Sequence, residues 1–525
     1  MSAFSRRHFV GLMGAAGSYA ATYPLIGRLG PTPAAAIAAY SSDTPGFETA
    51  TELARRLRDK EISSLELTDY FIGRIERYDG ALNAIVVRDF ERARAAARAA
   101  DAALAKGELA GPLHGLPMTI KDSFNVAGLP TTWGFPQFAN NIARSDSEMV
   151  KRFKAAGAHF MGKTNVPIAL GDYQSYNEIY GTTNNPWDLQ RVPGGSSGGS
   201  AAALAAGLTG LDSGSDIGGS VRNPAHFCGV YGHKPTWGVV PPNGHALPGQ
   251  ELIADLAVVG PLARSAEDLA LAMDIVSGPD PLNAPGWQLE LQPPRALSIK
   301  DLRVAVWPDD DICPVDREIV DRVLKIAELL AAKGAKVSDS ARPDFAAIDS
   351  HRTYLNLLMS ITSSGVPDDV YEQNEMRAAA YDPNDASAAA TRARAAVLSH
   401  RGWMGNDNFR AGLRARWQSF FADWDILLCP IMPTTAFPHD HGPPEQRTIR
   451  VNEEDFPYWQ QVFWAGLATV AYLPGTIFPT GLSNDGLPIG LQAIGPAFGD
   501  RTTIEFARLL AAELGGFTPP PGYAD

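Results

Sequence analysis

The most constraining feature of this sequence is a segment of small residues between Gly194 and Ser220. It reads GGSSGGSAAALAAGLTGLDSGSDIGGS, with glycine and serine at both ends and an alanine-rich middle. Glycine costs a helix or strand about 0.5–1 kcal/mol relative to alanine, so this composition needs a structural reason. A flexible linker is a poor interpretation, because Ala201–Ala206 and Ile217 are apolar and the segment does not repeat. We expect a closely packed helix between two Gly-Ser ends that form one site.

The second Gly-Ser end carries a candidate nucleophile, Ser220. In the run DIGGS at 216–220, this serine follows two glycines, so no side chain blocks a substrate and successive backbone N–H groups can converge into an oxyanion hole. A serine hydroxyl needs a base within hydrogen-bond reach. None of the ten histidines lies in a comparable glycine-rich context, whereas Lys121 ends a short apolar strand. Burial lowers the pKa of a lysine, so its neutral amine can accept a proton.

Further blocks accompany these two segments in a fixed order along the chain. They are GLPMTIKD at 115–122, GKTN at 162–165, TNNPW at 183–187, VRNPA at 221–225, GHKPT at 232–236 and GLPIGLQ at 486–492. Together with the 194–220 segment, they resemble the amidase signature family, the serine hydrolases that use a Ser–cis-Ser–Lys triad. The resemblance covers most of the chain.

The resemblance assigns a role to each residue of the expected site. It implies that Lys121 is the base, Ser220 the nucleophile and Ser196 the bridging hydroxyl, after a cis peptide between Gly195 and Ser196. The implied oxyanion donors are the backbone N–H groups of Ile217, Gly218, Gly219 and Ser220. Ser197, Asp216 and Arg222 are implied to hold the loop that carries these donors.

The same resemblance implies an α/β fold and a hydrolytic activity. The expected fold is one large α/β/α domain with a mixed twisted sheet covered by helices, without a cofactor or metal. The expected substrate is a small-molecule carboxylic amide, and the aromatic stretch at 456–464 favours an apolar or aryl amide. An ester or carbamate would use the same acyl chemistry. Other interpretations on this fold are a non-catalytic binding protein, which the intact triad disfavours, and one subunit of a glutamine-dependent amidotransferase.

Two other motifs offer competing sites. Residues 195–199 read GSSGG and match the G-x-S-x-G nucleophile elbow with Ser197 at its centre, but the preceding residues 191–193 indicate a turn where the elbow requires a buried strand. His439 and His441 could chelate a metal, although a solvated loop is the simpler interpretation. Neither motif displaces Ser220 as the expected nucleophile.

The first 38 residues are predicted to be a twin-arginine export signal. Arg6 and Arg7 precede a weakly apolar run rich in glycine and alanine, and small-residue cleavage sites follow at 34–36 and 36–38. We therefore expect the protein to be periplasmic or secreted. Residues 39–525 are then the amidase signature domain, in which 344–446 form a mostly helical layer that shapes the substrate pocket.

The composition of the chain limits the kinds of partner that the protein is expected to bind. The net charge of −13 and the lack of a basic stripe argue against nucleic acid, and no other stretch approaches the roughly 20 apolar residues of a membrane span. The three cysteines are far apart in sequence and are expected to be buried small hydrophobes.

Local patterns predict alternating helices and short strands, which favours an α/β fold. The expected helices are 51–59, 64–78, 89–106, 148–156, 200–207, 266–276 and 319–333, and Ser63 with Glu66 is expected to form a capping box at the start of the second. The expected strands are 115–122, 159–162, 208–210, 258–260, 302–307 and 425–428.

Overall fold

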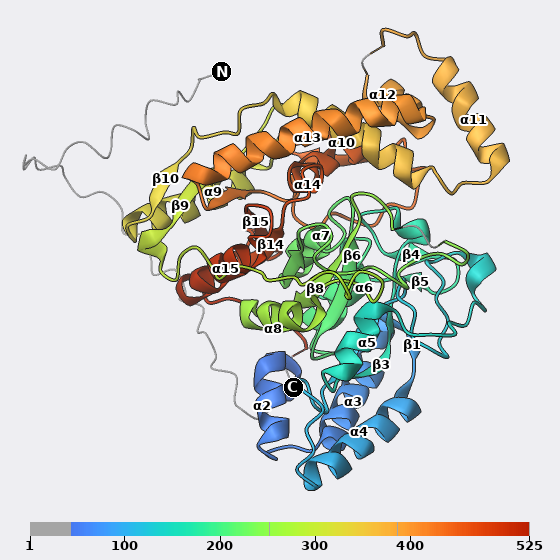
Figure 1. Ribbon diagram of the computed structural model, residues 1–525, viewed down its shortest axis with the longest axis vertical. Coiled ribbons are helices and arrows are strands. Elements are labelled where there is room, and N and C mark those ends of the chain that lie inside the picture. The colour runs from blue at the N-terminus through green and yellow to red at the C-terminus, as the bar shows by residue number, and fades with distance from the viewer. Residues whose placement is uncertain (1–43, 251–252, 386, 524–525) are drawn as a thin grey trace, which may run out of the picture. The chain divides into compact units, whose positions relative to one another are not determined.

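A mixed eight-stranded sheet forms the centre of the fold, in the order β10-β9-β11-β15-β14-β7-β8-β6 (Figure 1). β9 runs parallel to β10 and β11, and every other neighbouring pair in this sheet is antiparallel. The strands are β6 (Asp212–Asp216), β7 (Tyr231–Lys234), β8 (Val258–Ala263), β9 (Arg303–Val306), β10 (Lys336–Ser338), β11 (Ile426–Cys429), β14 (Gly475–Leu482) and β15 (Pro488–Ile494).

This computed structural model describes residues 44–250, 253–385 and 387–523. The predicted export signal at 1–38 lies outside the described residues. Residues from Thr44 onward form one unit built around a single contiguous hydrophobic core. Within the described ranges, no helix has the length and apolar composition that crossing a membrane requires.

A smaller three-stranded sheet, in the order β1-β3-β2, lies beside the end of the large one. Its strands are β1 (Ile85–Arg88), β2 (Pro117–Lys121) and β3 (His159–Thr164), and β2 and β3 are parallel. The Thr119 hydroxyl on β2 donates to Asp212 Oδ2 on β6 at 2.6 Å. The Thr119 N–H reaches the Leu211 carbonyl at 3.3 Å. These contacts place β2, and Lys121 at its end, alongside β6.

The sequence prediction failed at the strand that matters most for the site. Residues 208–210 were expected to begin a strand, but they form a turn, and the strand is the polar run Asp212–Asp216 that follows. All five residues of β6 are buried. Their side chains find polar partners inside the protein, as Asp212 does with Thr119, so the alternating apolar pattern that reveals most strands is absent.

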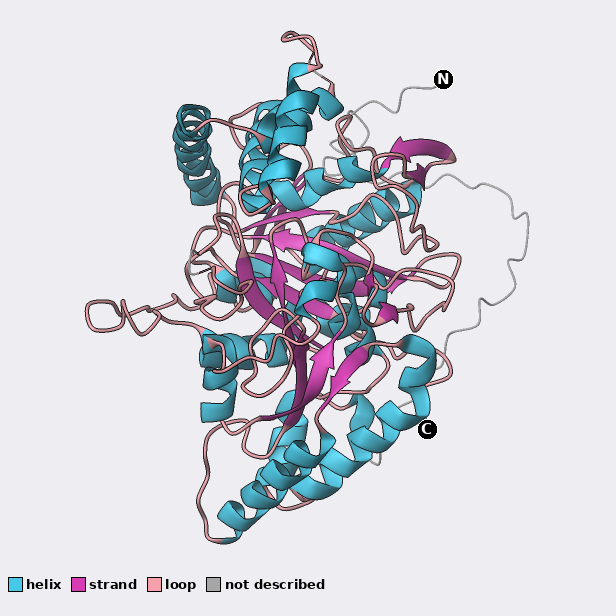
Figure 2. Ribbon diagram, turned by 90° about the vertical axis from the view of Figure 1, so that its right-hand side faces the viewer, coloured by secondary structure: helices cyan, strands magenta, loops and turns pink. Residues whose placement is uncertain are grey.

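Helices pack around the two sheets (Figure 2). They are α2 (Ala50–Arg58), α3 (Ser64–Leu82), α4 (Phe90–Ala105), α5 (Glu148–Ala155), α6 (Gly198–Ala205), α7 (Arg222–Cys228), α8 (Ala266–Val276), α9 (Arg317–Ala332), α14 (Val462–Thr469) and α15 (Asp500–Leu514). Each helix predicted from the sequence is present within a few residues, whereas α7, α14 and α15 were not predicted. The Ser63–Glu66 capping box at the start of α3 is also confirmed.

Four further helices are inserted between β10 and β11. They are α10 (Ala347–Thr362), α11 (Asp368–Ala379), α12 (Ala388–Ala396) and α13 (His400–Asp423). The expected helical layer at 344–446 is therefore shorter, because β11 returns the chain to the middle of the large sheet. α10 packs against α14 (Figure 1). A Cβ at Gly466 on α14 would overlap the ring of Tyr354 on α10, so only glycine permits this approach.

The remaining elements are short. Two hairpins pair β4 (Tyr176–Asn177) with β5 (Gly181–Thr182) and β12 (Thr448–Val451) with β13 (Glu454–Pro457). The 3-10 helices are η1 (Pro45–Phe47), η2 (Pro136–Phe138), η3 (Ile168–Leu170), η4 (Ile299–Asp301) and η5 (Tyr458–Gln461). The three cysteines are free and buried, as expected from their spacing.

Candidate active site

The Gly-Ser segment folds as the sequence indicates, with α6 between its two ends. Every residue of α6 is buried. A Cβ at Gly195 or Gly199 would overlap the backbone of residues 172–174 or of Asn165, so these glycines allow the close approach of neighbouring chains. The peptide between Gly195 and Ser196 is cis, as the family resemblance implied. The Ser197 N–H donates to the Ser220 carbonyl at 3.1 Å, which joins the two ends directly.

Lys121 lies at the centre of a buried group of hydroxyls. Its Nζ is 2.7 Å from Ser196 Oγ, 2.9 Å from Ser197 Oγ and 3.0 Å from Ser215 Oγ. Burial lowers the pKa of Lys121 from 10.5 to about 7, although Asp216 and Asp212 oppose this shift. The amine is therefore neutral in a substantial fraction of molecules at neutral pH, which is the form that a base requires.

Asp122, the next residue, turns away from this group, as the alternation of a strand predicts. Its Oδ1 lies 2.9 Å from Lys163 Nζ, and both side chains are fully buried. The Lys163 amine also donates to Thr131 Oγ1 at 2.9 Å. No carboxylate within the described ranges forms an ion pair with Lys121, so burial decides its charge.

Ser215 and Asp212 belong to the surroundings of Lys121, and the sequence analysis did not single them out. Ser215 faces Lys121 from β6. Asp212 accepts hydrogen bonds from Thr119 Oγ1 and from the Ser213 N–H, both at 2.6 Å. Burial raises the pKa of Asp212 to about 7 against the influence of these bonds and of Lys121. The run DSGSD was the available signal, because it places polar side chains on both faces of one strand, the aspartates on one and the serines on the other.

The 217–220 loop carries Ser220 and the expected oxyanion donors, and its four carbonyl groups all accept hydrogen bonds. The Ile217 carbonyl accepts from the Tyr354 hydroxyl and the Gly218 carbonyl from the Tyr173 hydroxyl, both at 2.8 Å. The carbonyls of Gly219 and Ser220 accept from the N–H groups of Asn223 and Ser197 at 2.6 and 3.1 Å. The orientation of each peptide in the loop is therefore fixed.

Some N–H groups of the same loop have a hydrogen-bond acceptor in the protein and others do not. Gly219 and Val221 donate to Asp216, at 3.0 Å to Oδ1 and 3.1 Å to Oδ2. Ile217, Gly218 and Ser220 have no protein acceptor for their N–H groups among the described residues. The structure thus differs from the expectation at Gly219, whose N–H is already used by Asp216. The expected donors left for a developing negative charge are those of Ile217, Gly218 and Ser220, in a loop where Ile217 and Gly218 are partly exposed.

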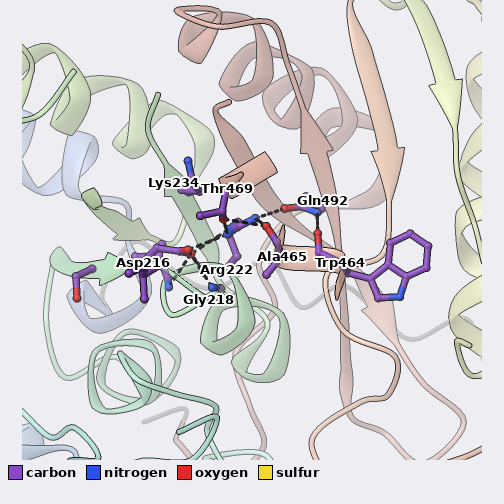
Figure 3. Close-up of polar contacts among 12 residues, drawn as sticks. Asp216, Gly218, Arg222, Lys234, Trp464, Ala465, Thr469 and Gln492 are labelled. Carbon is purple, nitrogen blue, oxygen red and sulfur yellow. Dashed lines mark hydrogen bonds and ion pairs between the residues drawn. The ribbon is translucent and has the colours of Figure 1, made fainter. Parts of the chain in front are cut away.

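A buried ion pair between Asp216 and Arg222 supports the 217–220 loop (Figure 3). Arg222 Nη2 lies 2.8 Å from Asp216 Oδ1, and Nε donates to Oδ2 at 2.9 Å. Arg222 Nη1 donates to Gln492 Oε1 at 2.6 Å, and Nη2 to Thr469 Oγ1 at 2.8 Å. Burial acts to raise the pKa of Asp216, but Arg222 outweighs it and lowers that pKa to about 2. Asp216 therefore stays ionised, and its charge is compensated.

Gln492 and Thr469 were not assigned a role from the sequence. Gln492 ends the GLPIGLQ block on β15, and its Nε2 donates to the Trp464 carbonyl at 3.3 Å (Figure 3). The block itself was the available signal, since its polar last residue is buried in a strand. Lys234, from the GHKPT block, directs its amine to the Leu473 carbonyl at 2.7 Å.

The competing motifs do not form a site of their own. The residues before Ser197 form a loop, and the Ser197 hydroxyl is bound by Lys121 within the same group as Ser196. The ring of His441 stacks on that of Tyr176, with the ring centroids 3.8 Å apart. The centroids of the His439 and His441 rings are 5.9 Å apart. The described ranges contain no group of three side chains that could hold a metal ion.

Solved structures share this fold. A bacterial aryl acylamidase of the amidase signature enzymes superimposes with a TM-score of 0.76 at 25% identity, over 91% of this chain and 98% of that one. A 6-aminohexanoate cyclic dimer hydrolase in complex with its substrate superimposes with a TM-score of 0.73 at 26% identity, over 91% and 100% of the two chains. The fold is therefore that of the amidase signature enzymes.

Sequence comparisons give the same result. The Amidase family profile matches residues 66–504. The chain is 33% identical to an indoleacetamide hydrolase of Bradyrhizobium diazoefficiens, over 89% of this chain and 86% of that protein. It is 32% identical to an acylamidase of Rhodococcus erythropolis, over 85% and 91% of the two chains. A glutamyl-tRNA(Gln) amidotransferase subunit of Anaeromyxobacter sp. (strain K) is 33% identical over 88% and 95%. The chain belongs to the amidase family of enzymes, which act on carbon–nitrogen bonds.

Proposed function

We propose that this protein hydrolyses carboxylic amides through an acyl-enzyme formed on Ser220. The observation that carries the proposal is the position of the buried Lys121 amine, 2.7 Å from the hydroxyl of Ser196. The residue after Ser196 donates its N–H to the Ser220 carbonyl, so the two serines lie on neighbouring segments. A serine nucleophile needs a base, and a lysine whose pKa is about 7 can serve as one near neutral pH.

The proposed reaction has two steps. The Ser220 oxygen bonds to the amide carbon, its proton passes through Ser196 to Lys121, and the carbonyl electron pair moves to the oxygen. The N–H groups of Gly218 and Ser220 stabilise that oxygen. The carbon–nitrogen bond then breaks as the Lys121 proton is delivered to the leaving amine. Water attacks the resulting ester with Lys121 again as base, which releases the carboxylic acid and restores Ser220.

The proposed substrate is an apolar or aryl amide. The atoms nearest to a Cβ built at Gly218 are the hydroxyl oxygens of Tyr354 and Tyr173 and Cγ2 of Val462, at 3.7–3.8 Å, and both hydroxyls already donate to loop carbonyls. The ring of Trp459 lies 6.1 Å from that of Tyr173. These aromatic and aliphatic groups suit an apolar acyl or amine part better than a charged one. The indoleacetamide hydrolase and the aryl acylamidase among the similar proteins have names that agree with this chemistry.

Esters and carbamates are the alternative substrates, since the same acyl-enzyme would form from them. An amidotransferase function is the other candidate, and the similarity to an amidotransferase subunit supports it. It requires a cytoplasmic protein that acts in a complex on a tRNA-bound substrate. We propose instead that the protein is exported by the twin-arginine route, on the basis of Arg6 and Arg7.

A labelling experiment tests the proposal. A fluorophosphonate probe should label the wild type, and Ser220→Ala should abolish both labelling and hydrolysis of a panel of aryl amides, aliphatic amides, carbamates and esters. Ser213→Ala is the matched control, because this buried serine lies on β6 and makes no side-chain hydrogen bond within the described ranges. It should keep wild-type labelling. Labelling that persists in Ser220→Ala would refute the assigned nucleophile.

A further inference from the structure

Tyr354 contacts the backbone of the 217–220 loop from a distant part of the chain. It lies on α10, its side chain is fully buried, and its hydroxyl donates to the Ile217 carbonyl at 2.8 Å. Burial raises the pKa of this hydroxyl above its ordinary value, so it stays protonated and remains a donor. The partner is the carbonyl of a peptide whose N–H belongs to Gly218.

The geometry of a peptide makes this contact relevant to the reaction. In a trans peptide the C=O and N–H bonds point in opposite directions. The 217–218 peptide is trans, because the cis peptide found in the described ranges lies between Gly195 and Ser196. The Gly218 N–H therefore points away from the Tyr354 hydroxyl, and it has no protein acceptor among the described residues.

Tyr173 holds the next peptide, with a different result. Its hydroxyl donates to the Gly218 carbonyl at 2.8 Å, so the N–H on the opposite side of that peptide belongs to Gly219. This N–H already donates to Asp216 Oδ1 at 3.0 Å. Two tyrosines thus fix two neighbouring peptides, but only the one held by Tyr354 offers its N–H to a substrate.

Gly466 makes the position of Tyr354 possible. A Cβ on this residue of α14 would overlap the Tyr354 ring. The neighbouring residue of α14 also approaches the loop, because Ala465 Cβ would lie 3.1 Å from a Cβ at Gly219. The helices α10 and α14 therefore approach the loop together, and the fit depends on the missing side chain of Gly466.

We propose that Tyr354 is a positioning residue, which aims the Gly218 N–H at the oxygen that becomes negative when Ser220 attacks. This inference rests on the proposed function, because it needs an oxyanion. Tyr354 does not touch the reacting atoms. It acts through the 217–218 peptide, which can rotate once its carbonyl loses the hydroxyl. The helices inserted between β10 and β11 then affect the rate of the chemical step as well as the shape of the pocket.

The decisive variants are Tyr354→Phe and Tyr173→Phe, each of which removes one hydroxyl and keeps the ring. We expect Tyr354→Phe to lower kcat by about tenfold to a hundredfold, part of the loss that follows from deleting an oxyanion donor, with KM changed by less than about twofold. Tyr173→Phe should lose much less. Tyr472→Phe, whose hydroxyl bonds Asp255 outside the site, controls for the loss of a tyrosine hydroxyl.

A tetrahedral mimic separates positioning from general damage to the fold. A trifluoromethyl ketone with the acyl group of the best amide in the panel forms an oxyanion on addition of the Ser220 oxygen. In Tyr354→Phe, the inhibition constant of this ketone should rise by the same factor by which kcat falls. The midpoint of thermal unfolding should shift no more than it does in Tyr472→Phe. Unchanged kcat, or a loss confined to KM, would overturn the inference.

A second variant covers the case in which Tyr354→Phe does not fold. Gly466→Ala displaces the Tyr354 ring and should give the same pattern of lower kcat and weaker inhibition by the ketone. Ser220→Ala keeps the two proposals apart. If it abolishes labelling while Tyr354→Phe and Gly466→Ala retain full kcat, the proposed function stands and only the role of Tyr354 is refuted.

Discussion

Replacement of Lys121 by methionine should abolish activity and yet stabilise the protein at neutral pH. An unfolded lysine is protonated at pH 7, whereas burial lowers the pKa of Lys121 to about 7 in the folded protein. The folded state therefore binds fewer protons than the unfolded state. Burying the amine lowers the free energy of unfolding by about 4 kcal/mol at pH 7, at roughly 1.4 kcal/mol per pKa unit. At pH 9 this cost falls to about 2 kcal/mol, because less free energy is needed to deprotonate the amine.

Methionine removes that cost but also removes three hydrogen bonds. The hydroxyls of Ser196, Ser197 and Ser215 each lose the amine as a partner, at about 1 kcal/mol per bond. The sum makes Lys121→Met about 1 kcal/mol more stable than the wild type at pH 7 and about 1 kcal/mol less stable at pH 9. The sign follows from the lowered pKa, since the folded wild type gains stability as the pH rises from 7 towards 10.5.

Guanidinium unfolding followed by tryptophan fluorescence at pH 7, 8 and 9 measures this difference. Lys325→Met is the control, because Lys325 is exposed on α9 and its replacement leaves the burial of charge unchanged. The free energy of unfolding of this control should differ from that of the wild type by the same amount at each pH. If the difference for Lys121→Met is equally flat, Lys121 is not neutralised on folding and the reasoning fails.

Two further predictions concern catalysis and export. Below pH 7, the acylation rate should rise by about tenfold per pH unit and then level off, because only the neutral amine of Lys121 accepts the proton of Ser220; Lys121→Arg should lose several orders of magnitude, since a guanidinium stays protonated. Rates measured from pH 5 to 9 check both, and substantial activity in Lys121→Arg would point to a histidine base instead. Conversion of Arg6 and Arg7 to lysine should retain the precursor in the cytoplasm, because the receptor recognises the arginine pair. Cell fractionation measures this, and unchanged export would remove the twin-arginine assignment.

Local patterns in the sequence were enough for most of the helices, though not for α7, α14 and α15, and for the position of the candidate base. The Ser63–Glu66 capping box, the alanine-rich run that became α6 and the apolar strand ending at Lys121 all act over a few residues. β6 was not predicted as a strand because its side chains bind polar partners elsewhere in the chain, so the run DSGSD has no apolar period. The amidase family resemblance supplied the candidate roles, which the blocks around Lys121 and Ser220 made specific.

Contacts between distant residues were beyond the reach of sequence reasoning. Tyr354 lies 137 residues from the carbonyl it binds, and nothing in the neighbourhood of Tyr354 marks it. The commitment of the Gly219 N–H to Asp216 depends on how the loop turns around one carboxylate. A run of glycines shows that N–H groups can converge, but the side chains that hold the carbonyls decide which of those groups remain available.

The hydrogen bonds of Arg222 also constrain when the loop can form during synthesis. Three of its partners, Ala465, Thr469 and Gln492, lie 243, 247 and 270 residues further along the chain. On a ribosome, the segment with Ser220 emerges long before the strand that carries Gln492. Until residues 465–492 have emerged, Asp216 is the only one of these four partners that the guanidinium can bind, and the surrounding sheet lacks its central strands β14 and β15. Contacts of such long range delay folding, so assembly of the active centre must wait until nearly the whole chain has been translated.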